Sequence, residues 1–255
     1  MHPGNYALWV AAGALAGGLN AIAGGGGFVV LPTLMFTGST PIFANTTGTV
    51  AVWPGIVSSL FAYRRRLNSH DHRIGLYALM AVIGSSLGAG LLLLTTNQFF
   101  LRILPYLLLT ATVLFAFGNR VTAWAMGHDS SSENPLPSWI PYGLLFLIAV
   151  YGGYFGGGMG IMTLAVLAVM GMRDLHEMNA LKSLWTMMIN GVAVVIFVAT
   201  GKVDWLPGLV MMAGAVTGGY MTGRFSQHVP QIWLRRLVIA IASTMTLYYF
   251  VHRGG

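Results

Sequence analysis

The chain has 255 residues, of which 56% are apolar and only 7% are charged, and its formal net charge is +7. A soluble domain carries about 25% charged residues, so this composition excludes an ordinary soluble globular protein. There is no cysteine, which excludes disulfides and thiolate chemistry. The basic residues lie in short loops between apolar blocks, where they orient a membrane protein and do not form a nucleic-acid-binding surface.

Apolar runs separated by glycine, proline or polar residues predict ten helical segments. In chain order these are 6–23, 28–37, 44–63, 74–95, 99–117, 138–155, 161–171, 178–200, 206–224 and 231–252. Several are long enough to cross a hydrocarbon core of about 30 Å. The predicted fold class is therefore an all-α polytopic membrane protein. We expect the first helix to be retained, because no positively charged region precedes it as in a cleaved signal peptide.

The second half of the sequence repeats the first. The polar stretch His128–Ser138 is the one linker-like segment and lies at the midpoint. We predict a first transmembrane repeat over 1–120, a polar linker over 121–137 and a second repeat over 138–255. Four matches occur in the same order in both halves. They pair Asn45 with Asn179, the glycine run 24–27 with 156–160, Gly84 and Gly88 with Gly214 and Gly218, and Arg102 with Arg235.

The basic residues distinguish two arrangements of these repeats. If the segments on either side of each glycine run form a hairpin that begins and ends on one face, three helices of each half cross the membrane and the repeats are inverted. Nine basic residues then share one side, with three on the other. The two sets are Arg64, Arg65, Arg66, Arg73, Arg120, Arg173, Arg224, Arg235 and Arg236, against Arg102, Lys202 and Arg253. The positive-inside bias favours this arrangement, with the N-terminus outside. If segment 6–23 crosses alone, the repeats are parallel and the split is seven to five.

Glycine runs break two of the apolar segments. Each glycine inside a helix costs about 1 kcal/mol relative to alanine, and broken backbone at membrane depth occurs only where it is buried in protein or lines a wet cavity. Helices that begin near Phe28 and Ile161 would present N–H groups and a partial positive charge at mid-membrane, which favours an anion site. The alternative is that these glycines serve close helix packing alone, as we expect for pairs such as Gly84 and Gly88.

A polar patch follows each break. Asn45, Thr46 and Thr49 share one helical turn, as do Asn179, Lys182 and Ser183, so each set can face one point. Lys182 is a basic residue inside an apolar segment, which indicates function, although a snorkelling side chain is the alternative. Asn20 either donates to the ligand or forms an interhelical hydrogen bond. The predicted substrate-binding residues are Asn20, Gly25, Gly26, Gly27, Phe28, Asn45, Thr46, Thr49, Gly158, Met159, Gly160, Asn179, Lys182 and Ser183.

The sequence contains no residue pattern typical of an enzyme or of a nucleotide-driven pump. We find no Ser–His–Asp set, no pair of intramembrane carboxylates and no nucleotide-binding loop, so we expect no enzyme, no catalytic residue and no cofactor. His70-Asp71-His72 is interpreted as a solvated loop and not as a metal site. Three tryptophans near segment ends, Trp53, Trp139 and Trp205, are predicted to anchor the protein at the membrane interface.

Several stretches resemble the signatures of the sulfite exporter TauE/SafE family, which includes permeases for 4-toluene sulfonate uptake. The first-half stretches are Gly17–Phe28, Ala44–Thr49 and Trp53-Pro54-Gly55. Those of the second half are Gly152–Met162, Asp174-Leu175-His176, Asn179–Lys182 and Val203-Asp204-Trp205. Gly27 and Met159 depart from the usual pattern.

The resemblance implies a multi-pass protein of the cell inner membrane that moves small sulfur-containing anions such as sulfite or organosulfonates. We expect a secondary transporter, with export favoured over import and the anion bound mid-membrane between the two broken helices. The alternative is a passive anion channel, or a permease for another small anion, on the same scaffold. The expected partners are the anion and the bilayer, with no nucleic acid; a homodimer is left open.

Overall fold

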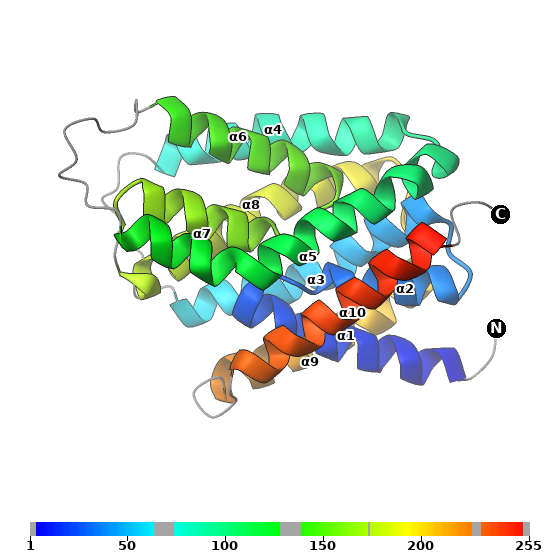
Figure 1. The fold of residues 1–255 in the computed structure, drawn as a ribbon. Coiled ribbons are helices and arrows are strands. Elements are labelled where there is room, and N and C mark those ends of the chain that lie inside the picture. Colours follow the sequence, from blue (N-terminus) through cyan, green and yellow to red (C-terminus); the bar gives the residue numbers. More distant parts are fainter. Residues whose placement is uncertain (1–3, 64–73, 128–138, 173, 226–230, 252–255) are drawn as a thin grey trace.

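The computed structural model describes residues 4–63, 74–127, 139–172, 174–225 and 231–251, and these form ten helices and no strand (Figure 1). The helices are α1 (Gly4–Ala23), α2 (Gly27–Phe36), α3 (Pro41–Tyr63), α4 (Ile74–Leu94), α5 (Asn97–Gly127), α6 (Trp139–Tyr154), α7 (Met159–Val169), α8 (Leu175–Ala199), α9 (Trp205–Phe225) and α10 (Gln231–Val251). This confirms the all-α prediction. The main difference is α5, predicted to end at 117, because its last turns are polar enough to leave an apolar run yet contain no proline that would stop a helix.

Helices α1 and α2 form a hairpin around the first glycine run. The indole N–H of Trp9, early in α1, donates a 3.0 Å hydrogen bond to the hydroxyl of Thr37, which follows α2. At the same end of the bundle, the N–H of Ile42 in α3 donates to Oδ1 of Asn97, where α5 begins, at 3.1 Å. We call this end, marked by Trp9, Thr37, Ile42 and Asn97, the N-terminal end. Figure 1 shows both chain termini on this side.

Helices α4 and α6 begin at the opposite end. The ring of Tyr77, in the first turn of α4, lies 6.4 Å from that of Tyr142 in α6 and 5.9 Å from that of Trp185 in α8. Helix α7 turns back toward this end after the second glycine run (Figure 1). The first hairpin therefore begins and ends at the N-terminal end, and the second at the opposite end.

Helix contacts occur in matched pairs when α1–α5 are compared with α6–α10. Helix α1 packs on α9 as α6 packs on α4, and α3 packs on α9 as α8 packs on α4. Glycines allow the closest contacts, as predicted. A Cβ atom at Gly17 would lie 2.0 Å from the carbonyl oxygen of Ala215 in α9, and one at Gly88 would lie 2.0 Å from that of Val150 in α6.

Helices α3 and α8 cross at the centre of the bundle. The Trp53 indole N–H donates a 3.1 Å hydrogen bond to the Met187 carbonyl oxygen. The prediction that Trp53 anchors the membrane interface is therefore wrong, because this position faces α8 and not lipid. Trp139 and Trp205 are exposed at the starts of their helices, as the prediction requires.

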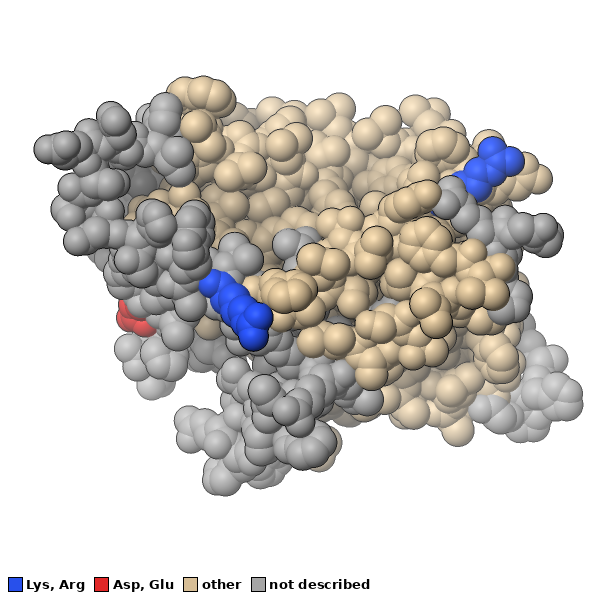
Figure 2. All heavy atoms as spheres, viewed as in Figure 1, with Lys and Arg blue, Asp and Glu red and all other residues tan. Residues whose placement is uncertain are grey.

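The outer surface is apolar along the length of a helix. Leu76, Leu79, Ile83, Leu87 and Leu91 are all exposed on α4, over about 22 Å at 1.5 Å per residue. Soluble monomers rarely expose such a stripe. Among the described residues, Gly75–Leu94 and Glu177–Ala199 are long and apolar enough to cross a membrane. Figure 2 shows charged side chains toward the two ends and an uncharged described surface between them.

Several predicted features lie outside the described residues. These are residues 128–137 of the predicted linker, the basic positions 64–66, 73, 173 and 253, and the stretch 70–72. The first part of the predicted linker, residues 121–127, belongs to α5, so the predicted start of the linker at 121 is wrong.

Candidate functional site

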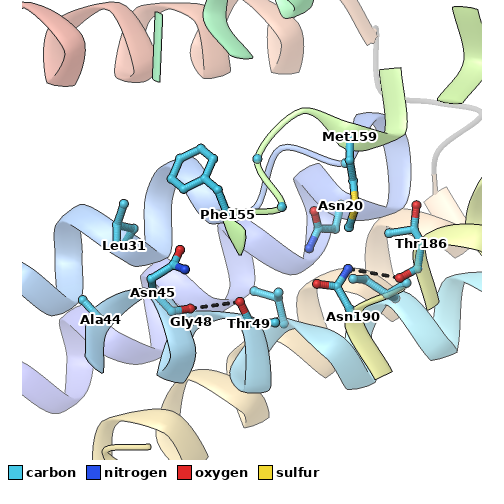
Figure 3. A pocket seen from close by; sticks show the side chains of 16 residues that line it. Asn20, Leu31, Ala44, Asn45, Gly48, Thr49, Phe155, Met159, Thr186 and Asn190 are labelled. Atoms are coloured by element: carbon cyan, nitrogen blue, oxygen red, sulfur yellow. Dashed lines mark hydrogen bonds between the residues drawn. The ribbon is translucent and has the colours of Figure 1, made fainter. Parts of the chain in front are cut away.

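A cavity of about 40 Å³ lies where the two glycine breaks face α3 and α8 (Figure 3). It has room for more than one water molecule, since one water needs about 10–15 Å³ by this measure. None of the described residues that line it is charged. Its polar side chains are Asn20 from α1, Asn45 and Thr49 from α3, and Thr186 and Asn190 from α8. Glycines of both breaks also line it, and the rest of the described wall is Leu31, Ala44, Gly48, Val52, Ile56, Phe155 and Met159.

The starts of the two short helices meet at this cavity. Gly27 and Met159, the first residues of α2 and α7, both line it. Each helix has a glycine as its N-cap residue, so neither N-cap contributes a capping side chain. A Cβ atom at Gly24, whose φ is +75°, would lie 3.5 Å from Cα of Gly160, which places the two breaks in contact. Two helix N-termini with partial positive charge therefore lie beside one small polar space.

Asn20 stabilises the first break. Its Oδ1 accepts a 2.9 Å hydrogen bond from the N–H of Gly26, so the side chain bridges the end of α1 and the start of α2. The bond joins α1 to the N-cap residue of α2, which is the interhelical alternative for the Oδ1 atom. Donation from Asn20 to a ligand stays a prediction. The acceptor atom is engaged with the backbone, and the amide NH2 group is the part of the side chain that can donate to a ligand in the cavity.

Of the three polar residues predicted on α3, Asn45 and Thr49 line the cavity and Thr46 does not. Asn45 lines the cavity and donates from Nδ2 to the Tyr154 carbonyl oxygen at 3.0 Å. The Thr49 hydroxyl, also in the lining, donates to the Asn45 carbonyl oxygen at 2.9 Å. Thr46 is not in the lining; its hydroxyl bonds to the carbonyl oxygens of Ile42 and Lys202.

The equivalent patch of α8 is closed. Lys182 is only 4% exposed and does not line the cavity. Its Nζ donates a 2.9 Å hydrogen bond to Oδ1 of Asn179, and the Ser183 hydroxyl donates to the Asn179 carbonyl oxygen at 2.8 Å. The ammonium group is thus held by a neutral amide inside the protein, which rules out the snorkelling alternative for this conformation.

The structure thus brings part of the predicted set together. The predicted residues in the cavity lining are Asn20, Gly27, Asn45, Thr49 and Met159. Those outside it are Gly25, Gly26, Phe28, Thr46, Gly158, Gly160, Asn179, Lys182 and Ser183.

Two polar lining residues, Thr186 and Asn190, were not predicted. Asn190 is 4% exposed and donates from Nδ2 to the Thr186 carbonyl oxygen at 3.1 Å. The Thr186 hydroxyl is buried and has no hydrogen-bond partner among the described residues. The signal was present in the sequence, because two polar residues four positions apart inside an apolar segment share one helix face and are costly unless they have a role.

Within the described parts of the chain, no group of three or more His, Asp or Glu side chains could hold a metal ion. The cavity offers amide and hydroxyl groups together with two helix N-termini. Such a set can bind an anion by hydrogen bonds without a formal cation in the wall.

Comparison with known proteins gives a consistent result. The family model described as sulfite exporter TauE/SafE matches residues 9–249. A probable membrane transporter protein of Haemophilus influenzae is 29% identical over 97% of this chain and 95% of its own length. The probable membrane transporter protein YfcA of Escherichia coli is 26% identical over 91% of this chain and 84% of its own. YunE of Bacillus subtilis, also named a probable membrane transporter protein, is 23% identical over 96% and 98%. No solved structure matches the chain.

Proposed function

We propose that this chain, which belongs to the sulfite exporter TauE/SafE family, is a secondary transporter that exports small sulfur-containing anions such as sulfite or organosulfonates across the inner membrane. One observation carries the proposal. The first residues of two broken helices line a single cavity whose described polar side chains are neutral. The helix termini supply partial positive charge, which favours an anion, and the described lining contains no carboxylate of the kind that binds a hard metal cation.

The donor set suits a compact oxyanion. A sulfite or sulfonate group has three oxygen atoms in a small volume, and each can accept hydrogen bonds. Asn20, Thr49, Thr186 and Asn190, which carry amide or hydroxyl groups, lie around one space (Figure 3). The Thr49 hydroxyl must release the Asn45 carbonyl oxygen, to which it donates here, before it can donate to the anion. We propose that the sulfur oxyanion occupies this space, with the backbone at Gly27 and Met159 nearest to its charge.

We further propose that the halves are inverted repeats and that the opposite end faces the cytoplasm. Two observations support this. The first hairpin begins at the N-terminal end, with Trp9 beside Thr37, whereas α6 begins beside Tyr77 at the opposite end. In addition, α5 and α9 run toward that end (Figure 1), and Arg120 and Arg224 lie in the last turns of these helices, as the positive-inside bias requires.

Among the described residues, the cavity lining offers no acidic side chain that could couple transport to protons. Asp204, immediately before α9, accepts a 2.6 Å hydrogen bond from the Ser39 hydroxyl at the N-terminal end. Protonation of the substrate itself, or the membrane potential acting on its charge, is the driving force that this site allows.

Flux in proteoliposomes tests the proposal. Purified protein should release trapped sulfite or methanesulfonate faster than empty liposomes do, with a rate that saturates. Unlabelled anion on the far side should accelerate labelled-anion exchange, because a carrier returns faster when loaded. The Asn45→Asp variant, which has nearly the same side-chain size but places a negative charge in the cavity wall, should lose this flux.

Two results would contradict the proposal. Transport of some other anion with no sulfite or sulfonate flux would overturn the substrate class. Non-saturating flux without exchange acceleration, together with single-channel currents, would replace the carrier by a passive anion channel.

A further inference from the structure

The cavity reaches only one of the two polar patches that correspond to each other in the sequence halves. Asn45 and Thr49 on α3 line it, while Asn179 and Ser183 at the matching positions of α8 do not. Both patches have the same internal hydrogen bond, from the hydroxyl to the asparagine carbonyl oxygen, at 2.9 Å in α3 and 2.8 Å in α8. The two patches therefore share local geometry, and they differ in whether the cavity reaches them.

The two patches also lie on different sides of the bundle centre. Helix α3 begins at the N-terminal end, whereas α8 ends there, since Thr46 of α3 bonds to Lys202 beyond the end of α8. The helices cross where Trp53 bonds to Met187. The Asn45 patch precedes this crossing in α3 and lies toward the N-terminal end. The Asn179 patch precedes it in α8 and lies toward the opposite end.

The closed patch contains a feature that the open one lacks. Lys182 occupies the position of Gly48 in the first half, and its ammonium group is buried against Asn179. Within the described residues no carboxylate forms an ion pair with it. A buried cation without a counter-charge is unfavourable, so an anion that reached this position would be held strongly.

A polar side chain leads from the cavity toward this cation. Thr186 lines the cavity and lies four residues after Lys182, about 6 Å along the same face of α8. Its hydroxyl is buried, with no hydrogen-bond partner. An anion displaced from the cavity along α8 would meet this donor before it reached the ammonium group.

We propose that Asn179, Lys182 and Ser183 form a second anion-binding position, which is closed in this structure and opens when the cavity shifts to the opposite end of the bundle. This inference rests on the proposed anion transport. The transported anion then meets neutral donors on the N-terminal side and a lysine on the other side. The ammonium group exchanges its bond to Asn179 for one to the anion, and returns to the amide when the anion leaves.

Thiol labelling tests this, because the natural chain contains no cysteine. Single Thr49→Cys and Ser183→Cys variants are treated with a membrane-impermeant maleimide in spheroplasts and in inverted vesicles. We expect the two thiols to react from opposite sides of the membrane. Methanesulfonate should protect both; sulfite is unsuitable here because it adds to maleimides. Thr112→Cys, which replaces a buried threonine of α5 that does not line the cavity, should stay unlabelled from both sides.

Labelling of both thiols from the same side would overturn the inference, as would a Ser183→Cys variant that still transports but reacts from neither side. Neither result would affect the proposed function, provided that the natural protein carries sulfite or sulfonate and that the anion protects the thiol of the Thr49→Cys variant.

A second measurement covers the case in which the Ser183→Cys variant does not fold. In vesicles of known orientation, Lys182→Met should raise the half-saturating anion concentration at the opposite end by about tenfold or more, the loss expected for a hydrogen bond to a charged group. At the N-terminal end the change should stay within about twofold, because Lys182 does not line the cavity. Equal changes at both ends would overturn the inference.

Discussion

The indole N–H of Trp53 donates a 3.1 Å hydrogen bond to the carbonyl oxygen of Met187, and these two residues are separated by the same sequence offset as Asn45 and Asn179. The bond joins α3 to α8 at the middle of both helices. The open patch lies on one side of this point and the closed patch on the other. A movement that opens one and closes the other would turn α3 and α8 about this contact.

Trp53→Phe keeps an aromatic ring and removes the N–H donor. We expect a loss of stability of about 0.5–1 kcal/mol, typical of one hydrogen bond between membrane helices, seen as a lower melting temperature in detergent. Trp205→Phe is the control, because Trp205 is exposed at the start of α9. Equal melting temperatures for the two variants would show that the Trp53 bond contributes nothing.

Gly88→Ala and Gly90→Ala form a matched pair on α4. A Cβ atom at Gly88 would lie 2.0 Å from the Val150 carbonyl oxygen, whereas one at Gly90 would meet no atom within 4 Å. Gly88→Ala must push α4 and α6 apart, so we expect a loss of about 1–3 kcal/mol. Gly90→Ala should be neutral or stabilising by up to about 1 kcal/mol, because alanine favours helix. Thermal unfolding distinguishes them, and a stable Gly88→Ala protein would contradict this helix packing.

Thr186→Val removes a buried hydroxyl that has no hydrogen-bond partner. Stability should stay the same or rise by about 1 kcal/mol, because no bond is lost and the desolvation cost disappears. Anion affinity should fall about tenfold if this hydroxyl donates to the substrate. The measurements are thermal unfolding and half-saturation of sulfite flux.

Thr112→Val is the control for this variant and should behave in the opposite way. The Thr112 hydroxyl donates a 2.6 Å bond to the Leu108 carbonyl oxygen, away from the cavity, so its loss should lower stability and leave affinity unchanged. Unaltered affinity in Thr186→Val would remove that residue from the binding site.

Asn20→Asp separates the structural role of Asn20 from its place in the cavity. The carboxylate can still accept the hydrogen bond from the Gly26 N–H, so the break and the melting temperature should be preserved. The added negative charge should reduce anion affinity by about tenfold or more, since like charges in a low-dielectric site repel strongly. Binding of sulfite, followed by isothermal titration calorimetry, gives the readout. Tight binding by a folded Asn20→Asp protein would place the anion elsewhere.

Much of the fold follows from local sequence. The helix boundaries agree with the apolar segments to within a few residues in most cases, because runs of glycine and stretches of polar residues end an apolar helix. Single prolines do not end these helices, since Pro32, Pro54 and Pro105 lie inside α2, α3 and α5. The breaks at 24–27 and 156–160 were evident for the same reason. Asn45 and Thr49 were found because a repeated polar patch inside an apolar segment is unusual.

The tertiary structure was needed to determine which side chains meet. Thr46 and Thr49 are equally polar and share one turn, yet only Thr49 lines the cavity. The Thr46 hydroxyl instead donates to the carbonyl oxygen of Lys202, in the loop between α8 and α9. Thr186 and Asn190 enter the site through the crossing of α3 over α8, which no local pattern encodes.

The glycine breaks of the two halves are determined by the sequence itself, since a run of glycines destabilises an apolar helix in any surroundings. The structure decided what these breaks do, by bringing Gly24 against Gly160 beside one cavity. It also left Lys182 outside that cavity. Both outcomes depend on contacts between helices far apart in the chain, and these are set by the packing of the whole bundle.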